Sequence, residues 1–188
     1  MTAKSKSWTL AEIKDELARI ARVGELFVEG DLCRKAWRPH AETFLRGDDM
    51  DYNPAAAVPL KKTLLRLERV GPFPCATTLW RRRPDMPEAG EPLLYGTLSS
   101  PDGIMKPPNR GYVPAPMTRE MKTVFLKGGT AWKVEAGGAR AVASLNRRPG
   151  VVSASVKRPT YVRRFVPVRD SLGEIAAALE VFAVVSPA

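Results

Sequence analysis

Aromatic and basic side chains alternate along residues 161–169, a spacing that suits the binding of a polyanion. Every second residue of a β-strand lies on the same face. On such a strand, one face would carry Tyr161, Arg163, Phe165, Pro167 and Arg169, and the other Val162, Arg164, Val166 and Val168. Aromatic rings stack on unpaired bases and guanidinium groups bind phosphates. If the valine face is core, the first face predicts a surface for single-stranded nucleic acid.

Further basic residues could extend this surface. Lys157 and Arg158 lie just before the segment, Arg147 and Arg148 precede a Pro-Gly turn, and three arginines follow Trp80. The predicted nucleic-acid-binding residues are Arg147, Arg148, Lys157, Arg158, Tyr161, Arg163, Phe165, Arg169, Trp80, Arg81, Arg82 and Arg83. The Lys and Arg side chains would bind phosphates, and the aromatic side chains would stack on bases.

The charge of the chain is concentrated in its second part. Residues 1–70 hold 13 Lys and Arg against 11 Asp and Glu, whereas residues 71–188 hold 17 against 9, for a total net charge of +10. Residues 136–169 contain eight Lys and Arg and no carboxylate. Such a surface attracts polyanions over a Debye length of roughly 8–10 Å. The expected partner is therefore nucleic acid or another acidic macromolecule.

Two other interpretations of the same residues remain open. Arginines on an exposed strand often prevent unwanted strand pairing, and Tyr161 and Phe165 could face the core beneath the N-terminal helices. The chain has 17 prolines. Basic proteins that are rich in proline also serve as assembly subunits, such as virion or connector components or adaptors. That alternative predicts a protein partner or a homo-oligomer.

Few residues suit catalysis or metal binding. The only histidine, His40, follows Cys33 at a spacing that is not typical of zinc sites, and one Cys-His pair fills half of a tetrahedral site. Cys33 follows Leu32 in an apolar periodic stretch, so we expect it to be a buried thiol, like Cys75, in a reducing compartment.

The acidic cluster and the glycine pairs also lack a complete motif. A calcium loop beginning at Asp49 would need glycine at its sixth position and glutamate at its twelfth, where the chain has Pro54 and Leu60. Gly128-Gly129 and Gly137-Gly138 lie outside any phosphate-binding motif, and the chain has no Gly-x-Ser-x-Gly sequence. We therefore expect no cofactor, no metal and a non-enzymatic protein. An enzyme whose site combines distant residues remains the second alternative.

The elements that must position these residues can be predicted from periodicity and capping. Thr9 and Glu12 form a capping box for a helix to about Val23. The other predicted helices are 31–37, 39–45, one opened by Pro59 with Leu60, Leu64 and Leu67 on one face, 139–146, and 171–179 after a second capping box. The predicted strands are 76–81, 92–98, 151–156, 161–168 and 181–185, together with a hairpin over 122–134 turning at Gly128-Gly129. Residues 47–54 and 99–118 are predicted loops.

Helices first and strands later predict an α+β fold. We expect an N-terminal helical region packed on or beside a mostly antiparallel β-sheet, with a short C-terminal helix. Residues 1–70 and 71–188 form two regions, which could be one continuous domain. The N-terminus has no apolar core of a signal peptide, and no window reaches the ~18–20 apolar residues of a membrane span. We therefore expect a cytoplasmic protein without membrane contact.

Overall fold

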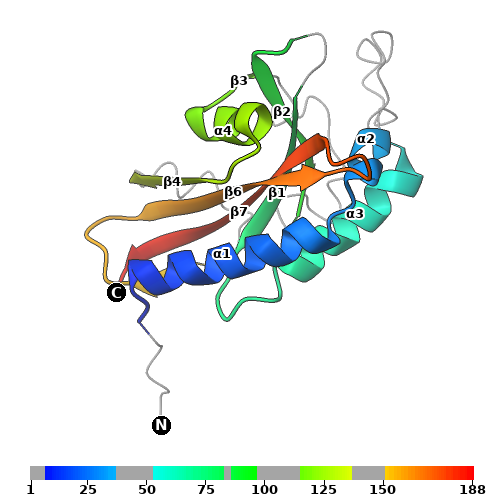
Figure 1. Cartoon of the computed structure of the whole chain (residues 1–188). Helices are drawn as coiled ribbons and strands as arrows, with labels where there is room; N and C mark the ends of the chain where they lie inside the picture. The colour runs from blue at the N-terminus through cyan, green and yellow to red at the C-terminus, as the bar shows by residue number, and fades with distance from the viewer. Residues whose placement is uncertain (1–6, 37–52, 83–85, 97–114, 137–150) are drawn as a thin grey trace, which may run out of the picture.

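The computed structural model describes residues 7–36, 53–82, 86–96, 115–136 and 151–188 (Figure 1). The elements are α1 (Leu10–Phe27), α2 (Gly30–Ala36), α3 (Pro54–Leu67), β1 (Ala76–Arg82), β2 (Ala89–Tyr95), β3 (Ala115–Pro116), α4 (Arg119–Lys127), β4 (Ala131–Ala136), β5 (Val151–Ala154), β6 (Thr160–Arg169) and β7 (Ile175–Pro187). None of the helices within these ranges is long and apolar enough to cross a membrane.

The strands form one sheet of seven in the order β3-β2-β1-β7-β6-β4. All pairs along this path are antiparallel. β5 alone is parallel, and it pairs with the last four residues of β7. β1 pairs with an earlier part of β7, over residues 178–182. The predicted α+β fold with a mostly antiparallel sheet is confirmed.

Helices lie on both faces of this sheet. α1 packs on β6 and β7, α2 on β7, and α3 on β1 and β2, whereas α4 packs on β4, β6 and β7 (Figure 1). One hydrophobic core joins α1–α3 to the strands, with Ile13 and Leu64 packed among Leu79, Val166 and Leu179. A second, smaller cluster lies under α4. The N-terminal helices therefore cover the face opposite to α4.

The first helix forms as its sequence predicts. The Thr9 hydroxyl accepts a hydrogen bond from the Glu12 amide, and the Glu12 carboxylate accepts one from the Thr9 amide at 2.7 Å. Ile13 and Leu17 are fully buried against the sheet. The helix approaches β7 closely at Gly24, where a Cβ atom would overlap the side chain of Leu179.

The third helix begins earlier than predicted. Asn53 caps its N-terminus by accepting a hydrogen bond from the Ala55 amide, and Pro54 occupies the first turn. Pro59, the predicted start, lies inside the helix. The predicted apolar face is confirmed, because Leu60, Leu64 and Leu67 are all buried.

The predicted hairpin over 122–134 is wrong, because residues 119–127 form α4. Thr118 caps this helix, and Met121 and Val124 pack one turn apart against the sheet. Gly128 adopts φ 65°, a conformation that favours glycine, and ends the helix as its C-cap. The glycine pair therefore separates a helix from β4 instead of joining two strands.

The predicted C-terminal helix at 171–179 is also wrong. Residues 170–174 form the turn between β6 and β7, and β7 then continues for 13 residues. Ser171 does not cap a helix, because its hydroxyl donates to Asp31 of α2 at 3.0 Å. β7 is buried on both faces over most of its length, so its apolar run reflects a central strand.

The other predicted elements are found in part. β1, β2, β5 and β6 correspond to the strands predicted at 76–81, 92–98, 151–156 and 161–168, and β7 includes 181–185. α2 corresponds to the helix predicted at 31–37. The predicted helices at 39–45 and 139–146, and most of the predicted loops at 47–54 and 99–118, lie outside the described residues.

Candidate nucleic-acid interface

Strand β6 carries the predicted arginine and aromatic pattern between β7 and β4. The predicted valine face is confirmed, since Val162, Val166 and Val168 belong to the main core. The opposite face is also covered. Phe165 is 1% exposed and packs with the α4 residues, and Tyr161 is 5% exposed beside Phe182. Neither of these two predicted stacking residues therefore presents an open ring face.

Arg163 lies on the α4 face of the sheet, between two carboxylates. Its Nη1 is 3.2 Å from Glu180 Oε1, and its Nε is 3.5 Å from Glu135 Oε2. The guanidinium carbon is also 5.7 Å from the centre of the Tyr161 ring and 5.8 Å from that of Phe182. The side chain that was predicted to bind phosphate therefore neutralises acids of the protein itself.

Glu180 is the acid at the centre of this arrangement. It is 2% exposed in the middle of β7, and its Oε2 accepts a hydrogen bond of 2.7 Å from the Trp80 indole. Burial raises the pKa of this carboxyl, although Arg163 and the Trp80 hydrogen bond act in the opposite direction. Trp80 was predicted to stack on a base, but here it binds a buried carboxylate.

The ion pairs continue along β4 to the edge of the sheet. Lys133 Nζ is 2.7 Å from Glu135 Oε1, and Glu135 also contacts Arg163. Two cations and two carboxylates therefore balance each other in a row that runs from β4 through β6 to β7. The register places Lys133 beside Arg163, and Arg163 beside Phe182. The formal charges of these four side chains therefore cancel within the protein.

Arg164 points to the opposite face and is also engaged. Its Nη2 donates to the Thr130 hydroxyl at 2.7 Å, and its guanidinium carbon is 4.9 Å from the centre of the Trp132 ring. Lys14 of α1 approaches the same ring, with its Nζ 5.9 Å away. Burial lowers the pKa of Arg164, and the nearby carboxylate of Glu25 opposes this shift.

Arg169 holds the end of β6 in place. Its Nη1 donates to the Gly173 carbonyl at 2.8 Å, and its Nη2 donates to the Gly128 carbonyl at 3.4 Å. The first bond closes the β6–β7 turn, and the second joins this turn to the end of α4. Arg169 is exposed, but these bonds fix its guanidinium group on the protein backbone.

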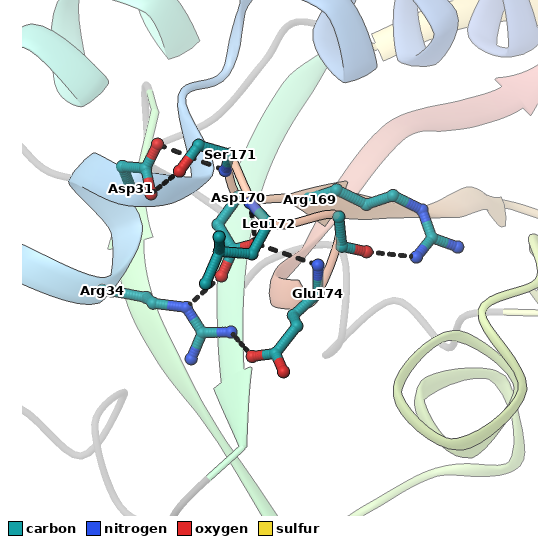
Figure 2. A network of polar contacts seen from close by, with 8 residues as sticks. Asp31, Arg34, Arg169, Asp170, Ser171, Leu172 and Glu174 are labelled. Atoms are coloured by element: carbon teal, nitrogen blue, oxygen red, sulfur yellow. Dashed lines mark hydrogen bonds and ion pairs between the residues drawn. The ribbon is translucent and has the colours of Figure 1, made fainter.

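The same turn is attached to α2 by a network of polar contacts (Figure 2). Asp170 Oδ1 accepts from the Leu172 and Glu174 amides at 3.0 and 2.9 Å, and Arg34 Nε donates to Oδ2 at 2.5 Å. Burial alone would raise the pKa of Asp170, but these hydrogen bonds outweigh it and lower the pKa. The turn is therefore a structural joint between the helical layer and the sheet.

The basic cluster after Trp80 is engaged as well, as far as the structure describes it. Arg81 forms an ion pair with Glu91, which is buried on β2. Arg82 is exposed, and its Nε donates to the Pro87 carbonyl at 3.1 Å. Arg83 lies outside the described residues, as do Arg147 and Arg148.

Lys157 and Arg158 differ from the other described members of the predicted surface. Both lie in the β5–β6 turn and are exposed. No ion pair or side-chain hydrogen bond joins either of them to another described residue. The backbone around them is held by a hydrogen bond of 2.8 Å from the Thr160 hydroxyl to the Arg158 carbonyl. Among the described residues, these two exposed cations therefore have no acidic partner.

The residues considered for catalysis or metal binding are described only in part. Cys33 and Cys75 are free and buried, as predicted, and burial raises the pKa of each thiol to about 12. Both thiols therefore stay protonated, which makes them poor nucleophiles. Within the described ranges, no group of three or more His, Cys, Asp or Glu side chains could hold a metal ion. His40 and the acids at 48–51 lie outside those ranges.

Neither the ion-pair row nor the contacts between the β6–β7 turn and α2 were predicted from the sequence. One signal was present, namely a single acid, Glu180, within the apolar run from Ile175 to Val185. An acid in such a position needs a partner when the run is buried. No protein-family model matches this chain, and no curated protein matches it.

Proposed function

We propose that this protein is a non-enzymatic polyanion-binding protein with nucleic acid as its ligand, and that the contact centres on the β5–β6 turn. The observation that carries this proposal is the exposure of Lys157 and Arg158 without an acidic partner among the described residues. Adjacent cations in this state can neutralise phosphates and release their counterions.

The burial of the aromatic residues sharpens the expected mode of binding. Tyr161 and Phe165 lie in the core, so stacking on unpaired bases has no support from these two rings. The remaining contacts are those of cations with phosphates, which carry no base-sequence information. We therefore expect binding that depends strongly on salt and little on nucleotide sequence.

Fluorescence anisotropy with labelled single- and double-stranded oligonucleotides, over a salt series, tests the proposal. The double substitution Lys157→Ala and Arg158→Ala should reduce the slope of log K against log salt by roughly 1.4–1.8, as expected for two phosphate contacts. Failure of the unmodified protein to bind at low salt would overturn the proposal.

A matched control separates a site from the effect of net charge. Arg119 and Lys122 are exposed on α4, and Figure 1 places this helix away from the β5–β6 turn. Replacing both with Ala removes the same charge, and we expect it to leave the salt slope unchanged. An equal decrease in both double variants would show that binding is distributed over the surface, which contradicts the proposed location.

A further inference from the structure

Strand β4 forms one edge of the sheet. It pairs with β6 through all six of its residues, from Ala131 to Ala136, without a bulge. No residue in the described part of the chain pairs with its outer side, where the order of the sheet ends. An unpaired strand of this kind can accept a further strand by main-chain hydrogen bonds.

The side chains of β4 are arranged in a way that favours a copy of the same strand. Lys133 and Glu135 have opposite charges and lie on one face on either side of Val134. Val134 is 44% exposed on the other face and thus offers apolar area to a partner. β4 contains no proline, so each backbone N–H on its outer side can donate a hydrogen bond to a further strand.

We infer that two copies of this protein associate by antiparallel pairing of their β4 strands, with Val134 on the two-fold axis. This register places Lys133 opposite Glu135 of the partner subunit, and Glu135 opposite Lys133 of the partner subunit. Each copy thus contributes the same patch, as a closed two-fold dimer requires. A two-fold axis at Lys133 or at Glu135 would instead place like charges opposite each other, which is unfavourable.

Among the described residues, the helices on both faces of the sheet leave room for this pairing. α4 contacts β4, β6 and β7, so its axis lies above β6, and α1 packs on β6 and β7. Strands are spaced ~4.8 Å apart, so the α4 axis is set back roughly 7 Å from the proposed two-fold axis. The two α4 helices would then lie roughly 14 Å apart, beyond the ~8–10 Å of close helix packing.

The expected dimer is weak and depends on concentration. Pairing through one short strand buries less than the ~1,200 Å² that is typical of stable interfaces. Cross-strand pairs of opposite charge contribute to the free energy of association, and like charges oppose it. Reversal of one charge should therefore weaken association roughly tenfold, since the change occurs at two symmetric positions.

Sedimentation equilibrium of the full chain over a concentration series, without nucleic acid, tests this inference. The unmodified protein should dimerise, whereas Lys133→Glu and Glu135→Lys should each need roughly tenfold higher concentrations to dimerise. Mixing the two variants restores opposite charges at both cross-strand pairs, so the mixture should form a heterodimer. Damage to the fold by either substitution would not be repaired by mixing.

A further variant avoids the contact between Glu135 and Arg163. Val134→Lys leaves that ion pair in place but brings two lysines together at the axis, so it should also dimerise more weakly than the unmodified protein. The inference is overturned if the unmodified protein is monomeric at all concentrations, if the single variants dimerise as tightly as the unmodified protein, or if their mixture associates no more tightly than either variant alone. Because no oligonucleotide is present, failure here would not bear on polyanion binding.

Discussion

Strand β6 and the β5–β6 turn are both basic in the sequence but differ in what their cations contact. Arg163, Arg164 and Arg169 of β6 contact carboxylates, a tryptophan ring and backbone carbonyls of the protein itself. Lys157 and Arg158 of the turn contact no described side chain of opposite charge. A high density of basic residues therefore does not by itself indicate an anion-binding surface. Cations that already contact groups of the protein itself must first be left out of the count.

The largest expected effect is the loss of stability on replacing Arg163, a cation of β6 with an internal role. Arg163→Ala leaves Glu180 buried without its cation, so we expect a loss of about 2–3 kcal/mol in the free energy of unfolding. Breaking a fully buried ion pair costs roughly 3–5 kcal/mol. We expect a smaller loss here because Arg163 is partly exposed to solvent. Urea denaturation at pH 7 measures it, and a loss below about 0.5 kcal/mol would contradict an internal role.

A smaller effect is expected for Glu180, and it should depend on pH. Burial raises the pKa of this carboxyl above its ordinary value of 4.5, so its contribution to stability is present below that pH and is lost as the pH rises. Glu180→Gln removes this dependence and keeps an acceptor for Trp80. The stability of the natural protein relative to the variant should therefore decrease from pH 4.5 upward, as followed by urea titrations.

Asp170 should show the opposite dependence on pH. Its pKa lies below its ordinary value of 3.8, so its contribution is present above that pH and is lost as the pH falls. Asp170→Asn should lower the melting temperature most at neutral pH and progressively less below about pH 4. Glu174→Gln is the control, because this exposed partner of Arg34 should have a smaller effect. Equal effects of both variants would argue against the joint.

The smallest expected effect on stability is that of replacing Lys157 and Arg158 of the β5–β6 turn. Because Lys157 and Arg158 have no described ion-pair partner, replacing both with Ala should change the free energy of unfolding by less than about 0.5 kcal/mol. The same variant should bind oligonucleotides more weakly. A large loss of stability would show that the turn has an internal role, which would remove the difference between the two regions.

Local signals predicted much of the fold. The capping box at Thr9 and Glu12 and the spacing of Leu60, Leu64 and Leu67 depend on residues within two turns, and both were confirmed. The errors arose where one local pattern fits two structures. A glycine at 128 suits a hairpin turn or a helix C-cap, and the apolar run of β7 suits a helix or a buried strand.

The candidate surface was harder to predict because it depends on distant contacts. Alternation identified β6 and its valine face, but it cannot show what covers the other face. Phe165 is buried by residues of α4, and Arg163 meets an acid of β7. Trp80 and Glu180 are separated by 100 residues in the chain, so neither side chain indicates the other in the sequence.

Glu180 also has a consequence for how the sheet assembles. Side chains of a strand alternate between faces, so a slip of β7 by one residue would move this carboxylate into the apolar core beneath α1–α3. There it would lose both Arg163 and the Trp80 indole, and the cost of an unpaired buried charge would oppose the slipped pairing. A single acid on β7, the longest of the described strands, thus selects one alignment of the sheet and disfavours the alignment shifted by one residue.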